Sequence, residues 1–465
     1  MIETARCHVL NDKPERDGKY VLYWMQQSQR AHFNPALEAA IIKANKIDLP
    51  VVVVFGLMDD YPEATERHYA FMLQGLRDVQ LDLEKRSIRF VCLHGEPKTA
   101  AIRLAKEAAC VVCDRGYLNH LRRWRDEMAD ACDVKVVEVE GDAVVPVEAA
   151  SDKAEIGART LRPRIHRVWE QFLVALRQTT PKHSSLKLKI TSDFDLSVPD
   201  KVLSTIRCDR AVKRSSFFEG GYHAADKRMK RFVAELLTGY ADGRNEPAAG
   251  HTSHMSPYLQ YGNISPVDLA LRVMEAKQSG PDRESYLEEM IVRRELSHNH
   301  CWFSRNYDRF DCLPAWARKS LDKHAADKRD PLYTREQLEL AKTHDRYWNA
   351  AQMEMVITGY MHNYMRMYWG KKILEWTKSP EDGFETTLYL NNRYFIDGLS
   401  PNAYGNVGWI YGLHDRPWIE RPIFGQTRYM NAAGLERKFE IDKYVDQIDA
   451  LCREHLGKPL AEISS

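Results

Sequence analysis

Short apolar runs alternate with amphipathic stretches through the first 140 residues, and this alternation limits the fold more than any other feature of the chain. The apolar runs are rich in β-branched and aromatic residues, as strands are, and lie at 20–25, 50–57, 88–93, 110–114 and 134–139. The stretches between them have the apolar spacing of helices and lie at 35–46, 67–85, 100–107 and 118–131. Such alternation is typical of a parallel sheet covered by helices on both faces. We therefore predict a Rossmann-like α/β domain over residues 1–146.

This first region has no recognisable catalytic or nucleotide-binding motif. It contains neither GxGxxG nor GxxxxGK[ST], so neither a dinucleotide fingerprint nor a P-loop supports nucleotide binding there. Cys110 and Cys113 have the spacing of a metal or redox pair, but they lie on a predicted strand, where residues three apart point to opposite faces. We predict no metal site and interpret the region as a scaffold.

Composition narrows the class of protein further. At 465 residues the chain suits two domains, and its formal net charge of +1 means that any nucleic-acid surface is a local patch. The first residues lack the apolar core of a signal peptide, and no apolar run approaches the roughly 18 residues of a membrane span. With nine scattered cysteines, these features predict a soluble cytoplasmic protein with reduced thiols and no membrane partner.

The alternating pattern ends near Val147. Stretches rich in Ser, Pro, Asp and Lys over 147–228 predict a long connector that crosses the surface. Helical periodicity dominates residues 229–465, where the aromatic residues are also concentrated. We predict that this second region is an all-α domain with an aromatic interior.

Tryptophans are spaced regularly in the second region. Trp369 and Trp376 lie seven residues apart, which on one helix places them about 20° apart in angle and about 10 Å apart along the axis. Periodicity alone is typical of core packing, although stacked indoles can also relay an electron to a buried acceptor. Trp348 would lie about 31 Å from Trp369 on one straight helix. Because Gly359 offers a helix break between them, we predict two helices that fold back and bring the three indoles together.

Four motifs give the second region a family resemblance. They are Trp348-Asn-Ala-Ala-Gln-Met-Glu-Met, Arg366-Met-Tyr-Trp, Leu390-Asn-Asn-Arg-Tyr and Arg428-Tyr-Met. Together they closely resemble class II DNA photolyases of the photolyase/cryptochrome family, and the resemblance extends from about Lys19 to Tyr444. It implies an antenna-type α/β domain, a helical FAD-binding domain and light-driven repair of cyclobutane pyrimidine dimers. In that reaction an electron passes from excited FADH− to a lesion flipped out of DNA.

The resemblance also implies the residues that hold FAD. The hydroxyl-rich segment before Pro257 is a good helix cap and anion site by itself, and in the family it holds the pyrophosphate. Arg366 and Asp397 match a buried salt bridge over the isoalloxazine, and Asn391 matches a loop asparagine that faces flavin N5. The remaining residues implied to bind the cofactor are Tyr240, Thr252, Ser253, Ser256 and Leu259. An antenna chromophore is expected too, with an identity that the resemblance leaves open.

Other residues are implied to act on the lesion or to carry electrons. Glu289 matches the carboxyl that hydrogen-bonds the damaged thymine. The implied electron path runs from Trp369 through Trp348 to Trp376, with Tyr333 in an auxiliary role. The lesion pocket and the elements that enter the duplex are implied to include Arg244, Asn245, Met367, Trp409, Trp418 and Arg428. The cluster of Arg428, Arg437 and Lys438 among aromatic residues predicts phosphate contacts, and the expected partner of this monomer is UV-damaged double-stranded DNA, which places it at the nucleoid when bound.

One local feature departs from the family pattern, and one position varies within the family. The loop after Trp409 is one residue shorter than in relatives, so the positions of Asp415 and Trp418 are open. Some family members also carry a lesion-stacking tryptophan where this chain has Arg293.

Three other functions compete with dimer repair. A cryptochrome-like photoreceptor would keep the tryptophans but need not keep Glu289, Arg244 and Trp409 together. Repair of (6-4) photoproducts relies on a histidine pair at the lesion, for which the candidates are His298, His300 and His414. A structural DNA-binding protein with a vestigial flavin would show no bleaching and recovery of the flavin spectrum under light.

Overall fold

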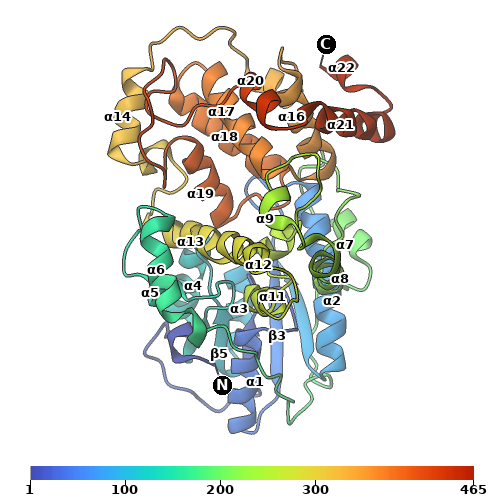
Figure 1. The fold of residues 1–465 in the computed structure, drawn as a ribbon. Coiled ribbons are helices and arrows are strands. Elements are labelled where there is room, and N and C mark those ends of the chain that lie inside the picture. Colours follow the sequence, from blue (N-terminus) through green and yellow to red (C-terminus); the bar gives the residue numbers. More distant parts are fainter. Residues whose placement is uncertain (1, 465) are drawn as a thin grey trace.

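The computed structural model describes residues 2–464 and begins with a mixed six-stranded sheet (Figure 1). The strands are β1 (Cys7–Val9), β2 (Tyr20–Trp24), β3 (Val51–Leu57), β4 (Arg89–His94), β5 (Ala108–Asp114) and β6 (Val136–Val139). They are ordered β1-β6-β5-β2-β3-β4, and every pairing is parallel except that of β1 with β6. The five predicted strands are confirmed within two residues at each end. β1 was not predicted, because three half-exposed residues give no pattern.

Helices cover both faces of this sheet, as predicted. They are α1 (Pro35–Lys46), α2 (Glu66–Lys85), α3 (Pro97–Ala105) and α4 (Asn119–Ala131). Alternate strand residues divide between two cores: Val21 and Val53 pack with α1 and α2, whereas Leu22 and Val52 pack with α3 and α4. Cys110 belongs to the first core and Cys113 to the second, which confirms that the two thiols point to opposite faces.

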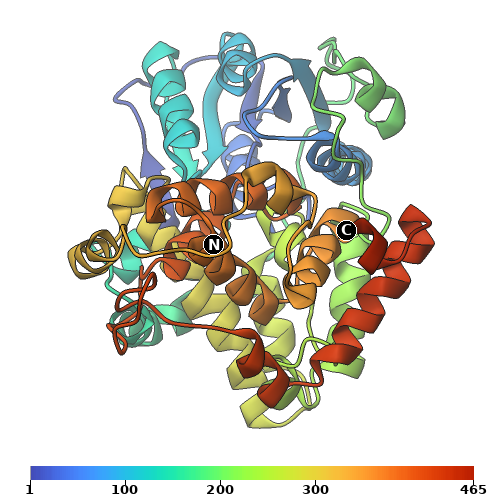
Figure 2. The ribbon, with the colours of Figure 1, turned by 90° about the horizontal axis from the view of Figure 1, so that it is seen from above.

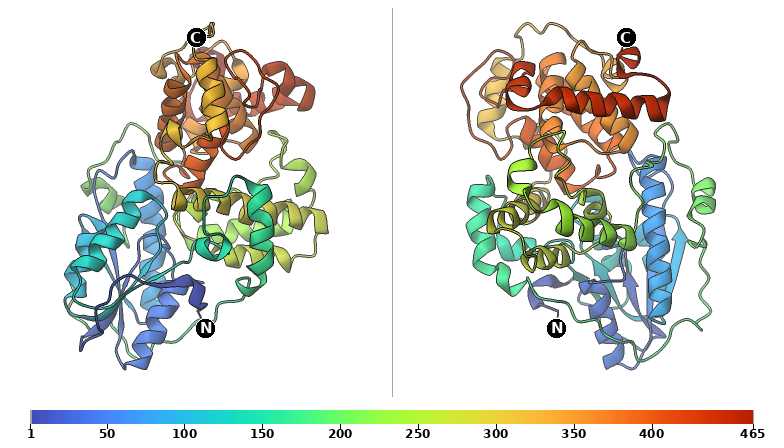
Figure 3. Two further views of the ribbon diagram at one scale, coloured as in Figure 1. Left: turned by 90° about the vertical axis from the view of Figure 1, so that its left-hand side faces the viewer. Right: turned by 45° about the vertical axis from the view of Figure 1, so that its right-hand side comes forward.

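The segment 147–228 combines short helices with long irregular stretches. It contains α5 (Val147–Ala150), α6 (Ala158–Val168), α7 (Pro199–Thr205) and the start of α8 (Tyr222–Arg231). α6 packs against the helical region and α7 against α2, so the segment follows the outside of both (Figure 3). The domain boundaries at 146 and 228 stay a prediction.

The rest of the chain is helical, and the sheet region lies along one side of it (Figure 2). Its elements are the π-helices η3 (Phe232–Leu236) and η4 (Glu288–Arg293), and α9 (Tyr240–Gly243), α10 (Ser256–Gln260), α11 (Pro266–Met274), α12 (Gly280–Leu287), α13 (Arg294–Phe303), α14 (Ala315–Lys323), α15 (Arg335–Glu339), α16 (Arg346–Thr358), α17 (Asn363–Trp376), α18 (Pro380–Tyr394), α19 (Pro401–Ile410), α20 (Ala432–Lys438), α21 (Ile441–Leu456) and α22 (Leu460–Ile463). Within residues 2–464, no helix is both long and apolar enough to cross a bilayer.

Charged side chains join the sheet region to the helices by bonding to backbone groups. Arg67 on α2 donates to the carbonyls of Met355 and Val356 at the end of α16, at 3.0 and 2.5 Å, and to that of Tyr394 at the end of α18, at 2.7 Å. A cation at two helix C-termini interacts favourably with both dipoles. Burial lowers the pKa of Arg67 to about 10, so the guanidinium remains charged at neutral pH. A helical residue makes the reverse contact. The Glu295 carboxylate on α13 accepts the backbone N–H groups of Val144 and Val145, which follow β6 in the sheet region.

Replacing Arg67 tests whether this contact fixes the two regions together. Arg67→Met should lower the free energy of unfolding by about 2–4 kcal/mol, since each buried group left without a partner costs about 1–3 kcal/mol. Arg67→Lys, which keeps the charge but has no planar fork, should fall between Arg67→Met and wild type. Thermal unfolding followed by circular dichroism measures the difference. A melting temperature of Arg67→Met equal to that of wild type would contradict the assignment.

Candidate active site

A left-handed turn at Gly359 brings the predicted tryptophans together. α16 begins at an Asp345 cap, whose carboxylate accepts the N–H groups of Tyr347 and Trp348 at 3.0 and 3.1 Å. It ends at Gly359, where φ is +79° and an added Cβ would lie 2.7 Å from Ile396 Cγ1. Only glycine fits this position without strain, so the chain reverses here into α17. The predicted break and the two folded-back helices are confirmed.

Three indoles lie in contact at the junction of α16 and α17. The ring centroids of Trp348 and Trp369 are 6.4 Å apart with planes 10° from parallel, and the Trp376 ring lies 5.8 Å from that of Trp348 at 66°. All three side chains are at most 2% exposed. Trp348 Nε1 donates to the Trp369 carbonyl at 2.9 Å, and Trp369 Nε1 donates to Gln352 at 2.8 Å, so both buried N–H groups are satisfied. Tyr333 continues the series, 5.5 Å from Trp376.

A two-pronged ion pair lies one turn from Trp369. Arg366 Nη1 and Nη2 contact the two carboxylate oxygens of Asp397 at 3.1 and 3.2 Å, a geometry that holds a guanidinium in one plane. The guanidinium also lies 3.8 Å from the Phe395 ring centroid. Asn391 is buried nearby, but the prediction that it lies in a loop was wrong. It occupies the last turn of α18, which continues to Tyr394 before the chain turns towards Asp397.

The hydroxyl-rich segment before α10 forms a polar cradle. Thr252 and Ser253 precede the helix and receive long hydrogen bonds from Tyr360 and Tyr286, at 3.5 and 3.4 Å, while Ser256 occupies the first helical position. Tyr240 packs against Tyr286, with ring centroids 5.4 Å apart, and Leu259 lies on the buried side of α10.

His254 shows that this cradle suits a polar ligand. Its backbone has φ +52°, and burial lowers its pKa to about 4, so the imidazole is neutral. Nε2 contacts the Thr252 hydroxyl at 3.0 Å, whereas within residues 2–464 no partner lies within hydrogen-bonding distance of the buried Nδ1. A buried polar atom without a partner is costly. This atom, the neighbouring hydroxyls and the Arg366–Asp397 pair fit a large, polar, partly aromatic cofactor such as FAD.

Glu289 and Arg244, predicted to act together on a lesion, form an ion pair of 2.9 Å. Both are partly exposed, so a ligand can reach them. Glu289 lies on η4, where the helix α12–α13 widens into π geometry, a distortion common at functional sites. His362, which caps α17, contacts the Arg244 carbonyl at 3.1 Å and so ties this pair to the tryptophan helix. Asn245 follows Arg244 in the turn after α9.

A shallow pocket gathers the residues predicted to contact DNA. Arg428 lies 4.3 Å from the ring of Trp418 and 5.2 Å from that of Trp409, and Asp415 contacts both Arg428 and Trp418. The pocket lining comprises Tyr364, Met367, Trp418, Ile419, Arg421, Arg428, Tyr429, Met430 and Lys438. Arg437 is exposed on α20 and does not line the pocket. Of the predicted DNA-contacting residues, the structure brings Met367, Trp409, Trp418, Arg428 and Lys438 to this pocket or against its lining. It leaves out Arg437 and the separate group of Arg244, Asn245 and Glu289.

Sequence reasoning missed the side chain that supports this pocket. Lys371 is fully buried, and its ammonium donates to the Ile410 carbonyl and to the Thr427 hydroxyl, the latter at 3.1 Å. Ile410 follows Trp409, and Thr427 precedes Arg428. The Lys371 side chain therefore joins α17 to both ends of the loop between Trp409 and Arg428. Burial lowers the pKa of Lys371 to about 7. Lys371 therefore fixes the loop after Trp409 from the interior of the protein.

The candidate histidines are not placed around Glu289. His298 contacts the Arg294 carbonyl and packs on Tyr117, whereas the rings of His300 and His414 lie 5.4 Å apart. His300 follows Glu289 by eleven residues along η4 and α13, roughly 16 Å along the axis. The two neighbouring histidines, His300 and His414, therefore do not lie beside the Glu289 carboxylate.

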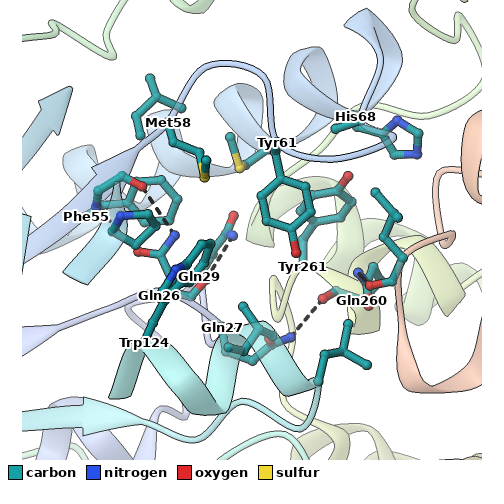
Figure 4. Close-up of a pocket in the computed structure, with 18 of the residues that line it drawn as sticks. Gln26, Gln27, Gln29, Phe55, Met58, Tyr61, His68, Trp124, Gln260 and Tyr261 are labelled. Atoms are coloured by element: carbon teal, nitrogen blue, oxygen red, sulfur yellow. Dashed lines mark hydrogen bonds between the residues drawn. The ribbon is translucent and has the colours of Figure 1, made fainter. Parts of the chain in front are cut away.

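A second pocket, which the sequence did not predict, lies where the sheet meets the helices (Figure 4). It opens at the carboxyl ends of β2, β3 and β5, next to the point where the strand order reverses, as ligand sites in such sheets do. About 850 Å³ of empty space, part of it open to solvent, is lined by aromatic and amide side chains, among them Gln26, Tyr61, Trp124 and Tyr261. Gln27 crosses the boundary and donates to the Gln260 carbonyl at 3.2 Å.

Similarity to known proteins extends over nearly the whole chain. A deoxyribodipyrimidine photo-lyase of Methanothermobacter thermautotrophicus is 48% identical over 98% of this chain and 100% of its own length. Proteins of the same name from Arabidopsis thaliana and Potorous tridactylus are 40% and 39% identical over 95% of this chain, and over 91% and 82% of their own lengths.

Solved structures share the fold at low identity. A class III photolyase from Agrobacterium tumefaciens has a TM-score of 0.72 at 19% identity, covering 98% of this chain and 91% of its own. An archaeal photolyase from Sulfolobus tokodaii, described with two FAD molecules, has a TM-score of 0.69 at 13% identity, covering 96% and 92%. Residues 21–183 match the DNA photolyase family directly. With relatives this similar over this much of its length, the chain belongs to the DNA photolyase family.

Proposed function

We propose that this chain is a class II deoxyribodipyrimidine photo-lyase that repairs cyclobutane pyrimidine dimers in UV-damaged double-stranded DNA. The observation that carries the proposal is the arrangement along α17. Its first turns border the shallow pocket through Tyr364 and Met367, its middle carries Arg366 and Trp369, and its end carries Trp376. One helix thus connects a basic aromatic surface, a polar cofactor cradle and a buried series of indoles.

Bound in the cradle in its reduced form, FAD would supply the electron that splits the cyclobutane ring after excitation by light. The chain's own residues would hold and orient the cofactor and the lesion. The segment 252–256 would take the pyrophosphate, the Arg366–Asp397 pair would cover the ring system, and the Asn391 amide can accept or donate a hydrogen bond. Glu289 and Arg244 would hold the flipped lesion, at a cost of a few kcal/mol for extrusion from the duplex.

We also infer that the pocket at the sheet edge takes a planar antenna chromophore. Its aromatic and amide lining suits stacking and hydrogen bonding to a flat, polar ring system. The second FAD described for the Sulfolobus tokodaii protein supports the idea of a light-harvesting ligand on this fold. The enzyme would act as a monomer in the cytoplasm and join the nucleoid when bound to DNA.

The direct test is an absorption spectrum of the purified protein, followed by illumination with an oligonucleotide that carries one thymine dimer. We expect a flavin spectrum and light-dependent loss of the dimer. A photoreceptor would show the flavin spectrum without repair, and a structural DNA-binding protein would show no flavin photochemistry.

Glu289→Gln should weaken lesion binding while the flavin spectrum stays intact. The substitution keeps a hydrogen-bonding group but removes the charge that pairs with Arg244, and losing such a partner costs about 1–3 kcal/mol, roughly 5- to 150-fold in affinity. Glu288→Gln is the matched control, because this neighbouring carboxylate pairs instead with Arg162 and Arg293. Gel-shift titration with and without a dimer measures the effect. Wild-type lesion affinity in Glu289→Gln would remove Glu289 from the site.

Neutralising Arg428, Arg437 and Lys438 to Gln should weaken DNA binding and flatten its salt dependence. Each lost phosphate contact lowers the log–log slope by about 0.9 on duplex DNA. A triple change of the exposed Lys182, Lys187 and Lys189 controls for net charge alone. If both triple variants keep the wild-type slope, the cluster does not contact phosphates.

Trp369→Phe should block photoreduction of the flavin by an external thiol but leave repair intact after reduction with dithionite. Phenylalanine fills most of the space at a packing cost of about 1 kcal/mol, but it is much harder to oxidise. Repair returns its electron and so needs no external supply once the flavin is reduced. Photoreduction at the wild-type rate would mean that electrons arrive by another path.

A further inference from the structure

The outer end of the indole series is closed by Tyr333 and His344. The Tyr333 ring lies 5.5 Å from Trp376 and the His344 ring 5.2 Å from the same indole. Trp376 is 2% exposed, whereas His344 is exposed to solvent. The Tyr333 backbone N–H donates to the Trp376 carbonyl at 3.0 Å, which fixes the tyrosine beside the indole. These two side chains therefore separate the buried tryptophans from water.

Both hydrogen-bond partners of the Tyr333 hydroxyl belong to His344. The oxygen accepts the backbone N–H of His344 at 2.9 Å, and the hydroxyl lies 2.8 Å from His344 Nδ1. A phenol has one proton to donate, and the backbone amide already donates to its oxygen. In the tautomer with the imidazole proton on Nε2, Nδ1 is the acceptor that lies within reach of the phenol proton. This arrangement requires the neutral imidazole with its own proton on Nε2.

This geometry suits oxidation of the tyrosine. A phenol that loses an electron becomes a strong acid, so the electron leaves readily only when a base takes the proton. A base must lie within about 2.6–3.2 Å of the proton-bearing atom, and 2.8 Å meets this condition. Hydrogen bonding by a group that is not a base would hold the hydroxyl equally well but would not accept its proton.

We propose that His344 is the proton acceptor for oxidation of Tyr333 by the Trp376 radical cation. One electron passes from Tyr333 to Trp376, which returns to a neutral indole. The Tyr333 O–H proton moves to His344 Nδ1, leaving a neutral tyrosyl radical and an imidazolium, which can release its Nε2 proton to water. The inference rests on the proposed function, because Trp376 must first be oxidised through Trp369 and Trp348. His344 thus keeps the oxidising equivalent at the surface, where a reductant can reach it.

The test compares His344→Gln with Tyr333→Phe and wild type. Glutamine retains the backbone N–H and a side-chain acceptor near the hydroxyl but is not a base. Illumination of the oxidised holoenzyme should give a neutral tyrosyl radical in wild type, detected by electron paramagnetic resonance, and none in Tyr333→Phe. In His344→Gln the tryptophan radical should still form, but the tyrosyl radical should form about 10²–10⁴-fold more slowly, the usual contribution of a positioned base.

A measurement in the dark tests the hydrogen bond independently of the flavin chemistry. Nitrogen-15 NMR of His344 should show the Nε2–H tautomer in wild type and a shifted Nδ1 signal in Tyr333→Phe. A tyrosyl radical formed at the wild-type rate in His344→Gln, or an Nδ1–H tautomer in wild type, overturns the role of His344 and leaves the relay intact. If wild type forms neither aromatic radical, or Trp369→Phe forms both normally, the relay fails and this proposal fails with it.

Discussion

The reversal of the chain at Gly359 is the constraint on which both the fold and the candidate site depend. It folds α16 back on α17 and so places Trp348 against Trp369. The Gly359 carbonyl accepts the N–H of Ile396 at 3.0 Å, which draws in the segment that leads to Asp397. Arg67, from the sheet region, packs its Cδ 3.2 Å from the position a Cβ would take at this glycine. A side chain there would disturb the indole series, the ion pair and the contact between regions at once.

Much of this architecture was predictable because it depends on local patterns. Apolar runs and helical spacing located the strands and the helices of the first region, and a single Gly between two aromatic stretches located the reversal. Patterns failed where length or context decided the outcome. β1 is a three-residue edge strand, too short for periodicity, and its antiparallel pairing made the sheet mixed. Asn391 was expected in a loop, but the Ser379 cap starts a helix that runs past it.

Features built from distant segments were invisible in the sequence. Lys371, in Trp-Gly-Lys-Lys, looks like one charge on an exposed helix face, yet its burial is set by α19 and the following loop packing over it. The pocket at the sheet edge joins Gln26, which follows β2 in the sheet region, and Tyr261, which follows α10 in the helical region. Each of its residues alone is unremarkable. For Glu289, charge patterning indicated a solvated helix, and only the family resemblance gave it a role before Arg244 was seen beside it.

The direction of α17 separates two surfaces that a repair enzyme has to serve. Tyr364, at its start, borders the basic pocket, and Trp376, at its end, lies against Tyr333 and His344. Twelve residues of helix put these positions about 18 Å apart along the axis. A small reductant arriving beside His344 would therefore not compete with a duplex for the same surface. In the proposed relay, a flavin that became oxidised while the protein was bound to damaged DNA would be reduced again without release of the DNA.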